Sequence, residues 1–288
     1  MIRTTPPSRV HFVLVAAIAA LVIAAWVLGP VAGAQTPAPY RILVTNDDGV
    51  RAPGILALAR VLQDLGEVTI VAPAENQSGK GHSITIGDPL YADVVELPGG
   101  LKATAVVATP ATCVKVALGT LLADRVDLVV SGINRGWNVG RVAYVSGTVG
   151  AAREAALQGI PAIAASLASA GHPDYEAAAR MVRRVAEQVK ARGLEPGVFL
   201  NVNVPAGAFE TLKGLRLTTQ SSQTGVERFE EQRSPAGRRY FWSIWQEPTG
   251  DPEGTDVWAV EHGYVAVAPM RAGEFDAITF ERWKDVLR

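Results

Sequence analysis

Two adjacent carboxylates, Asp47 and Asp48, follow directly on a short apolar run and are well placed to do chemistry. Residues 42–44 are aliphatic and lead into Asn46-Asp47-Asp48-Gly49, a pattern that predicts a buried strand entering a tight turn. In open α/β sheets, ligands bind beyond the carboxyl ends of the strands. Two close carboxylates repel each other unless one is protonated or a cation lies between them. A hard divalent metal ion, which prefers oxygen ligands, is the simplest resolution.

Two further polar segments follow predicted strands. Asn76-Gln77-Ser78-Gly79 comes just after the strand expected at 68–72, and the hydroxyl of Ser78 can give a metal ion a neutral oxygen. Residues 131–140 contain three glycines together with Asn134 and Asn138. Glycine lets backbone N–H groups approach an anion closely, and asparagine amides can bind metal or phosphate. A flexible polar loop is the alternative interpretation of each segment.

Ser146-Gly147-Thr148 opens a helix predicted over residues 148–158. The N–H groups at a helix N-terminus have no partner within the helix and favour negative charge, so they commonly bind phosphate. The two hydroxyls would add donors, although simple N-capping is the alternative. His82 is a weaker candidate for orienting phosphate or transferring a proton, because a single loop histidine is more often a surface residue.

The elements that must position these residues alternate between apolar strands and helices. Strands are expected at 42–45, 68–72, 104–108, 128–130, 162–165 and 198–204, and helices at 54–65, 148–158 and 175–192. Another helix starts at Thr109-Pro110 and is expected to turn Cys113, Val116, Ala117 and Leu121 inward. This order predicts the α/β class, with a Rossmann-like three-layer core around a mostly parallel sheet.

Two parts of the chain depart from this alternation. Residues 74–100 are rich in glycine, proline and polar side chains, and predict a long loop with a hairpin. Residues 215–245 combine polar alternation, turn signals and an aromatic cluster, and predict a β-hairpin extension or oligomerisation arm at about 210–250. A short helix at 255–261 and a final strand at 264–268 complete the expected elements.

The N-terminal residues 1–34 have the composition of a secretory signal peptide. Arg3 and Arg9 precede an apolar run at 12–28, and Ala32-Gly33-Ala34 offers a small-residue cleavage site. We therefore expect residues 35–39 to be a linker, residues 40–288 to be one domain, and the protein to be exported to the periplasm. If the segment is not cleaved, it anchors the chain in the membrane; if it is cleaved, no stable membrane partner is expected.

Composition narrows the class of protein further. The chain has 288 residues, 48% of them hydrophobic, which suits one large α/β domain. Its net charge of −1 gives no indication of non-specific nucleic-acid binding. Cys113 is the only cysteine, so an intramolecular disulfide and a cysteine-based metal site are both excluded. The glycine fingerprint of dinucleotide-binding proteins and the P-loop are absent from the sequence.

Together these motifs resemble the SurE family of survival-protein 5′/3′-nucleotidases. The resemblance covers about residues 41–270 and runs through ILVTNDDGVRAPGI, VAPAENQSGKGHSIT, DLVVSGINRGWNVG, SGTVGAAREAALQGIPAIAAS and GTDVWAVEHGYVAVAPM. It implies one divalent metal ion per subunit, Mg²⁺ or Mn²⁺, held by Asp47, Asp48, Ser78 and Asn134. It also implies a phosphate between the metal, Asn46, Asn138 and the turn Ser146-Gly147-Thr148, and homodimers or homotetramers with an exchanged C-terminal arm.

Two positions near the expected site depart from the family pattern. Members usually carry tyrosine immediately before Ser-Gly-Thr, whereas this chain has Val145 there, with Tyr144 one residue earlier. An acidic residue is common where this chain has Arg141. These differences bear on substrate preference more than on the chemistry. The N-terminal signal segment is a third departure, because most relatives are regarded as cytoplasmic.

The expected activity is metal-dependent hydrolysis of nucleoside 5′- and 3′-monophosphates to nucleoside and phosphate, with Asp47 and Asp48 as the catalytic residues. One alternative is a broad acid phosphatase or exopolyphosphatase without nucleoside preference. Another is a protein that binds nucleotide or phosphate without turnover, which the acidic pair disfavours because carboxylates repel phosphate unless a metal intervenes.

Overall fold

The computed structural model describes residues 38–122, 125–168, 171, 173–273 and 275–286. The chain divides after Pro39, and the fold described below begins at Tyr40. The expected signal peptide at 1–34 and the first residues of the expected linker lie outside the described residues. Among the residues that are described, no helix combines the length and apolar character needed to cross a membrane.

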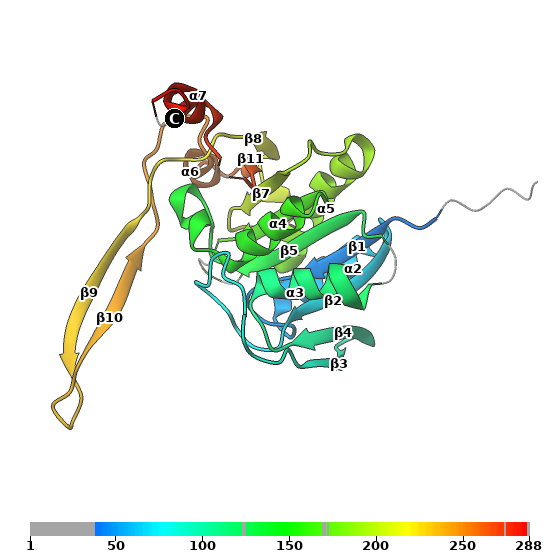
Figure 1. Ribbon diagram of the computed structural model, residues 1–288, viewed down its shortest axis with the longest axis horizontal. Coiled ribbons are helices and arrows are strands. Elements are labelled where there is room, and N and C mark those ends of the chain that lie inside the picture. The colour runs from blue at the N-terminus through cyan, green and yellow to red at the C-terminus, as the bar shows by residue number, and fades with distance from the viewer. Residues whose placement is uncertain (1–37, 123–124, 169–170, 172, 274, 287–288) are drawn as a thin grey trace, which may run out of the picture. The chain divides into compact units, whose positions relative to one another are not determined.

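Within the described residues, nine strands form one sheet in the order β3-β4-β2-β1-β5-β6-β7-β11-β8 (Figure 1). The neighbouring pairs from β4 to β7 are parallel, whereas β3 pairs antiparallel with β4 and β11 with β7. The mostly parallel α/β sheet predicted from the sequence is therefore confirmed. The strands are β1 (Arg41–Thr45), β2 (Glu67–Pro73), β3 (Ala92–Leu97), β4 (Leu101–Val106), β5 (Leu128–Arg135), β6 (Ala162–Leu167), β7 (Val198–Val204), β8 (Leu215–Leu217) and β11 (Val265–Arg271).

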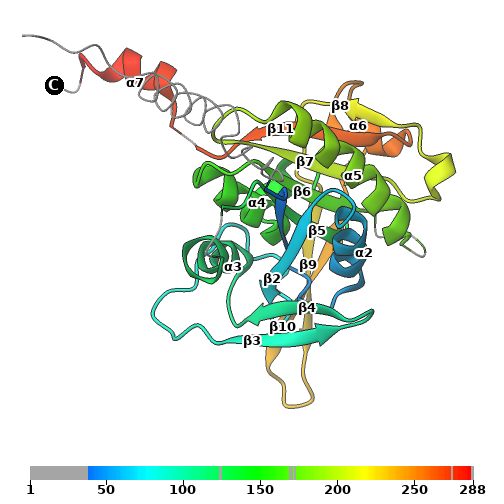
Figure 2. The same ribbon diagram turned by 90° about the vertical axis from the view of Figure 1, so that its right-hand side faces the viewer.

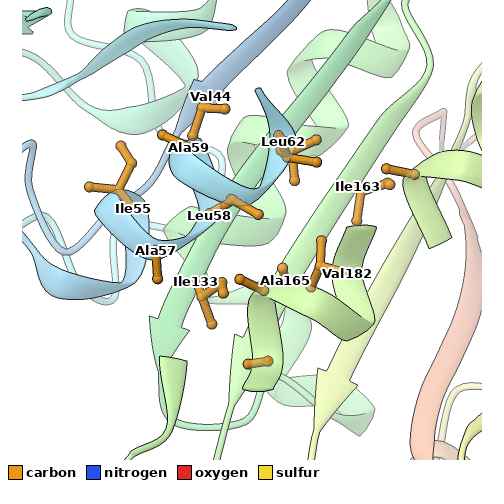
Figure 3. Packing of buried hydrophobic residues seen from close by; sticks show 14 of the residues in the cluster. Val44, Ile55, Ala57, Leu58, Ala59, Leu62, Ile133, Ile163, Ala165 and Val182 are labelled. Carbon is orange, nitrogen blue, oxygen red and sulfur yellow. The ribbon is translucent and has the colours of Figure 1, made fainter. Parts of the chain in front are cut away.

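Helices cover both faces of this sheet. Figure 2 shows α2 (Pro53–Leu62) and α5 (Tyr175–Arg192) on one side, and α3 (Pro110–Val116) and α4 (Gly147–Leu157) on the other. Side chains of a strand alternate between the faces, so Ile42 and Val44 join the α2/α5 core while Leu43 joins the α3/α4 core. Figure 3 shows α2 residues Ile55, Leu58 and Leu62 over the sheet in the first of these cores.

Strand β5 is longer than the sequence indicated, because it continues through residues that were expected to form a loop. Arg135 still pairs with Leu167 of β6, after a register shift between Ser131 and Asn134. Gly132 permits this shift: its φ is +141°, and a Cβ there would lie 2.3 Å from the carbonyl oxygen of Ala165. The irregular end of the strand places the polar side chains of 131–135 at the carboxyl end of the sheet.

Two other local expectations were wrong. The hairpin near residue 100 consists of β3 and β4, so its second strand is Leu101–Val106 rather than 104–108. Helix α3 ends at Val116 and continues as a π-helical turn, η1 (Ala117–Leu121). A π turn places side chains differently from an α-helix. Cys113 and Ala117 are buried as predicted, but Leu121 is 41% exposed.

The C-terminal part contains the expected hairpin and one unexpected helix. Strands β9 (Val226–Arg233) and β10 (Arg239–Gln246) form a separate two-stranded ribbon, which leaves the sheet in Figure 1. The short helix α6 (Asp256–Glu261) precedes β11. Helix α7 (Ala277–Trp283) was not predicted, and its apolar side chains Ile278, Phe280 and Trp283 are exposed.

Candidate active site

The predicted site residues gather where β1, β2 and β5 end and α4 begins. The turn after β1 is tied to the segment after β2, because Gln77 N donates to the carbonyl oxygen of Asp47 at 2.7 Å and Val50 N to that of Pro73 at 2.8 Å. Strands β2 and β5 are the two neighbours of β1 in the sheet. The topology therefore brings the acidic turn, the Ser78 loop and the end of β5 together at the carboxyl ends of these central strands.

Asp47 is buried against the N-terminus of α4. The Thr148 hydroxyl donates to Asp47 Oδ1 at 2.5 Å. A Cβ on Gly147 would lie 2.8 Å from the Cβ of Asp47, so only glycine allows this close approach. Burial raises the pKa of Asp47 despite the hydrogen bonds from the hydroxyl and backbone of Thr148 and from Gly147, which lower it.

Asp48 faces the end of β5 instead. Its Oδ2 accepts a hydrogen bond from Arg135 N at 3.2 Å. Burial, followed by the charge of Asp47, raises the pKa of Asp48 to about 6. Burial and the charge of Asp48 also raise the pKa of Tyr175, at the start of α5. No sequence motif indicated a role for this tyrosine, which lies far from the acidic turn along the chain.

The donor set fits a hard cation. Both carboxyl groups have raised pKa values, mainly because they are buried, so the groups around them compensate their negative charge incompletely. A bound dication would compensate this charge and lower both pKa values. The described residues hold no cluster of three His, Cys, Asp or Glu side chains, which leaves neutral oxygens to complete a metal site. Asn134 Nδ2 donates to the carbonyl oxygen of Gly136 at 2.8 Å, so its Oδ1 is oriented away from that contact. Ser78 is exposed on the loop that Gln77 ties to Asp47.

Three of the predicted phosphate-binding residues also hold the site together. Asn46 is buried and closes the acidic turn, with Nδ2 donating to the carbonyl oxygen of Gly49 at 2.8 Å. Ser146 is the N-cap of α4, as its Oγ accepts from Val149 N at 3.2 Å. Asn138 Nδ2 donates to Ser166 Oγ at 2.7 Å in a buried polar network. The helix begins at Gly147, one residue earlier than expected.

Comparisons with known proteins agree with this geometry. Residues 42–227 match the family model described as survival protein SurE. A protein named 5′-nucleotidase SurE from Geobacter sulfurreducens is 48% identical over 231 residues, covering 80% of this chain and 87% of that protein. The chain belongs to the SurE family. A protein of the same name from Cytophaga hutchinsonii is 45% identical, covering 79% of this chain and 89% of its own length.

A solved SurE structure has the same fold. The crystal structure of the SurE protein from Aquifex aeolicus superposes with a TM-score of 0.76 at 35% sequence identity, covering 86% of this chain and all of that one. The predicted fold class and the predicted family are thus both confirmed.

The two positions expected to depart from the SurE pattern, Arg141 and Val145, lie along the short 3₁₀ helix η2 (Gly140–Tyr144) and at its end. The side chains of Val145 and Tyr144 are 57% and 52% exposed, and the Arg153 guanidinium lies 5.6 Å from the centre of the Tyr144 ring. Val145 contributes through its backbone, since its carbonyl oxygen accepts from Gly81 N at 2.9 Å. Arg141 N donates to the carbonyl oxygen of Gln223 at 2.8 Å.

His82 has a partner that the sequence did not indicate. Its Nε2 lies 2.9 Å from Glu154 Oε2, and Lys115 Nζ lies 3.3 Å from Glu154 Oε1. Burial alone would raise the pKa of Glu154, but hydrogen bonds from Gln158 and His82 and the charge of Lys115 outweigh it and hold the pKa below its usual range. These contacts join the loop that follows Ser78 to α4. The sequence AAREAALQ reads as an ordinary helix, so it offered no signal for this role of Glu154.

Proposed function

We propose that this chain is a metal-dependent phosphomonoesterase that hydrolyses nucleoside 5′- and 3′-monophosphates to nucleoside and phosphate. The observation that carries the proposal is the junction of Asp47, Asp48 and the N-terminus of α4 at one sheet edge. Carboxylates at such a place repel a phosphate, whereas a helix N-terminus attracts one. A divalent cation on the carboxylates makes the two halves compatible. The curated relatives carry the name 5′-nucleotidase, which supports the nucleotide substrate.

One divalent cation per subunit, Mg²⁺ or Mn²⁺, would be held by Asp47, Asp48, Ser78 and Asn134. When bound, the cation supplies neutralisation of the negative charge on the phosphoryl group. Asp47 is kept in place for this by Thr148, and Asp48 by the backbone of Arg135. Carboxylate, amide and hydroxyl oxygens suit these hard cations.

The phosphate would be bound by Asn46, Asn138, Ser146, Gly147 and Thr148. The backbone N–H groups of Gly147 and Thr148 bind Asp47, and that of Val149 binds Ser146 Oγ. The start of α4 would therefore stabilise charge on the phosphoryl oxygens mainly through the positive end of its helix dipole. The hydroxyl hydrogen of Ser146 remains able to donate while its oxygen caps the helix. Asn46 and Asn138 fix the two loops on either side of this site.

Phosphate release by the purified protein tests this function. The substrates are 5′-AMP, 3′-AMP, polyphosphate and an aryl phosphate, each with Mn²⁺, Mg²⁺ or EDTA. We expect metal-dependent release that favours the nucleotides. Equal release from the aryl phosphate would indicate a broad phosphatase instead, and preference for polyphosphate an exopolyphosphatase. Nucleotide binding without release, by folded protein with metal present, would replace the enzyme with a binding protein.

We further propose that the chain forms homodimers or homotetramers through the ribbon of β9 and β10. Cross-strand pairing puts Phe229, Phe241 and Trp245 on one face of the ribbon and Val226, Tyr240 and Trp242 on the other. All six side chains are at least 37% exposed in the single chain. Apolar side chains on both faces of a two-stranded ribbon favour burial against another subunit.

Export to the periplasm is proposed from residues 1–34 alone. Mass spectrometry of the protein recovered from its native compartment would test it. A mature N-terminus at Gln35 is expected for a cleaved signal peptide, whereas an intact N-terminus in the membrane fraction would indicate an anchor.

A further inference from the structure

Asp256 is a fully buried carboxylate that lies outside the proposed metal and phosphate residues. It is the first residue of α6, and its side chain accepts hydrogen bonds from backbone N–H groups of two distant segments and of the next residue. Oδ2 accepts from Gly140 N at 2.9 Å, and Oδ1 accepts from Ser221 N and Val257 N, each at 2.9 Å. An aspartate suits this position because all three partners donate.

The segment that leads into the ribbon holds the same turn. Gln220 Nε2 donates to the carbonyl oxygen of Gly140 at 2.7 Å, and the carbonyl oxygen of Gln223 accepts from Arg141 N at 2.8 Å. The packing is tight, since a Cβ on Gly140 would lie 2.5 Å from the Gln223 oxygen. We call Asp256, Gln220 and Gln223 the Gly140 clasp.

The other side of this turn is fixed by the main sheet. Asn138 N donates to Asn203 Oδ1 at 2.7 Å, and Asn201 Nδ2 donates to the carbonyl oxygen of Asn138 at 2.8 Å. From Gly140 the chain passes through η2 directly to Ser146, the N-cap of α4. The clasp therefore determines how the chain runs between two proposed phosphate-binding residues.

We propose that Asp256 is a positioning residue for the phosphate site, and that it acts by fixing Gly140 together with the root of the ribbon. Asp256 does not touch the proposed substrate. It holds the path from Asn138 to Ser146, so the affinity for the phosphate group depends on it. The kinetic part of this inference rests on the proposed function, whereas the structural part does not.

The variant Asp256→Asn tests the contact selectively. The asparagine oxygen can still accept from Ser221 N and Val257 N, but its amide group then faces Gly140 N, which loses its acceptor. Gly140 N is then a buried donor without an acceptor, which destabilises the path from Asn138 to Ser146. We expect KM for nucleotide to rise about 5-fold or more, with a smaller change in kcat. Thr255→Ala is the matched control, because it removes the N-cap of the same helix without touching Gly140.

A second variant and a second measurement keep the test decisive. Gln220→Ala removes the other side-chain contact to Gly140 and replaces Asp256→Asn if that variant fails to fold. Hydrogen exchange at residues 137–146 of the full chain is expected to accelerate in both variants and not in Thr255→Ala. If the wild-type protein shows no turnover, this exchange difference still tests the clasp. Unchanged exchange and KM in the folded variants, or equal changes in Thr255→Ala, would overturn the proposal.

Discussion

At the scale of single residues, Asp47 and Asp48 are adjacent in sequence but supported by different elements. Asp47 is held by the start of α4 and Asp48 by the end of β5. Separate supports suit the proposed metal site, because contacts that fix the orientation of a ligand increase its affinity for the metal. In that proposal neither carboxylate can replace the other.

We expect Asp47→Asn and Asp48→Asn each to lower kcat/KM by more than about 100-fold, since charge stabilisation of several kcal/mol is at stake. The fold should persist because the side-chain volume is unchanged. Asp64→Asn is the control, as its carboxylate is exposed and pairs with Arg183. Steady-state assays with saturating Mn²⁺ provide the measurement, and near-wild-type rates in either site variant would rule out its role.

The raised pKa of Asp48 predicts how stability depends on pH in metal-free protein. A carboxyl whose pKa is about 6 when folded, above its unfolded value, binds more protons in the folded state. The stability that this carboxyl group contributes to the fold is fully present below its unfolded pKa, near 4, and is lost as the pH rises through about 6. Asp48→Asn should therefore increase Tm more at pH 7 than at pH 4.5. Thermal unfolding with EDTA measures this, and a pH-independent difference would contradict the assignment.

At the scale of elements, the approach of α4 to the acidic turn depends on one missing side chain. In Gly147→Ala, the new Cβ would meet the Cβ of Asp47 at 2.8 Å and Pro110 Cγ at 3.2 Å. Crowding of this kind costs about 1–3 kcal/mol, and here it would also displace a carboxylate of the proposed metal site.

We therefore expect lower stability and a larger fall in activity than in Gly119→Ala, where no atom lies within 4 Å of the added Cβ. Denaturant unfolding and phosphate release measure the two effects. Equal behaviour of the two alanine variants would show that the close approach at Gly147 is not required.

The sequence predicted elements whose burial is uniform and missed those that depart from a simple pattern. The apolar runs of β1 and β6 and the amphipathic helix α5 were found because continuous or periodic burial is visible in composition. The end of β5 was missed because its polar residues follow a register shift, and α7 because its seven residues are too few to show a helical period.

For the candidate site too, sequence analysis located some residues and missed others. The acidic turn, Asn134 and the start of α4 could be located because they lie where strands end and a helix begins. Asp256 and Glu154 could not, because each makes contacts between segments far apart in the sequence, and short-range patterns carry no information about such contacts.

At the scale of the whole molecule, the ribbon of β9 and β10 is a hairpin that, within the described residues, pairs with no other strand. A two-stranded hairpin is at best marginally stable in isolation, so its apolar faces favour association. We expect deletion of residues 228–243, with a short turn joining the cut ends, to lower the oligomeric mass while the main sheet remains folded.

Light scattering after size-exclusion chromatography measures the mass, and circular dichroism checks the fold. Arg233→Gln, at the far end of β9, is a control that leaves the aromatic side chains in place. A deletion variant of unchanged oligomeric mass would assign assembly to another surface, with the exposed side chains of α7 as the next candidates.

The ribbon also has exposed strand edges, which can promote aggregation. Within the described residues, each of its two strands pairs only with the other, so each has an outer edge of backbone groups without a β-sheet neighbour. Such edges can recruit other chains into unregulated sheets. Charged residues of β9 lie opposite aromatic residues of β10, as where Glu231 pairs with Phe241 and also binds Arg239 at 2.7 Å. Non-specific stacking of ribbons would bury these charges, so charged residues at these positions oppose aggregation.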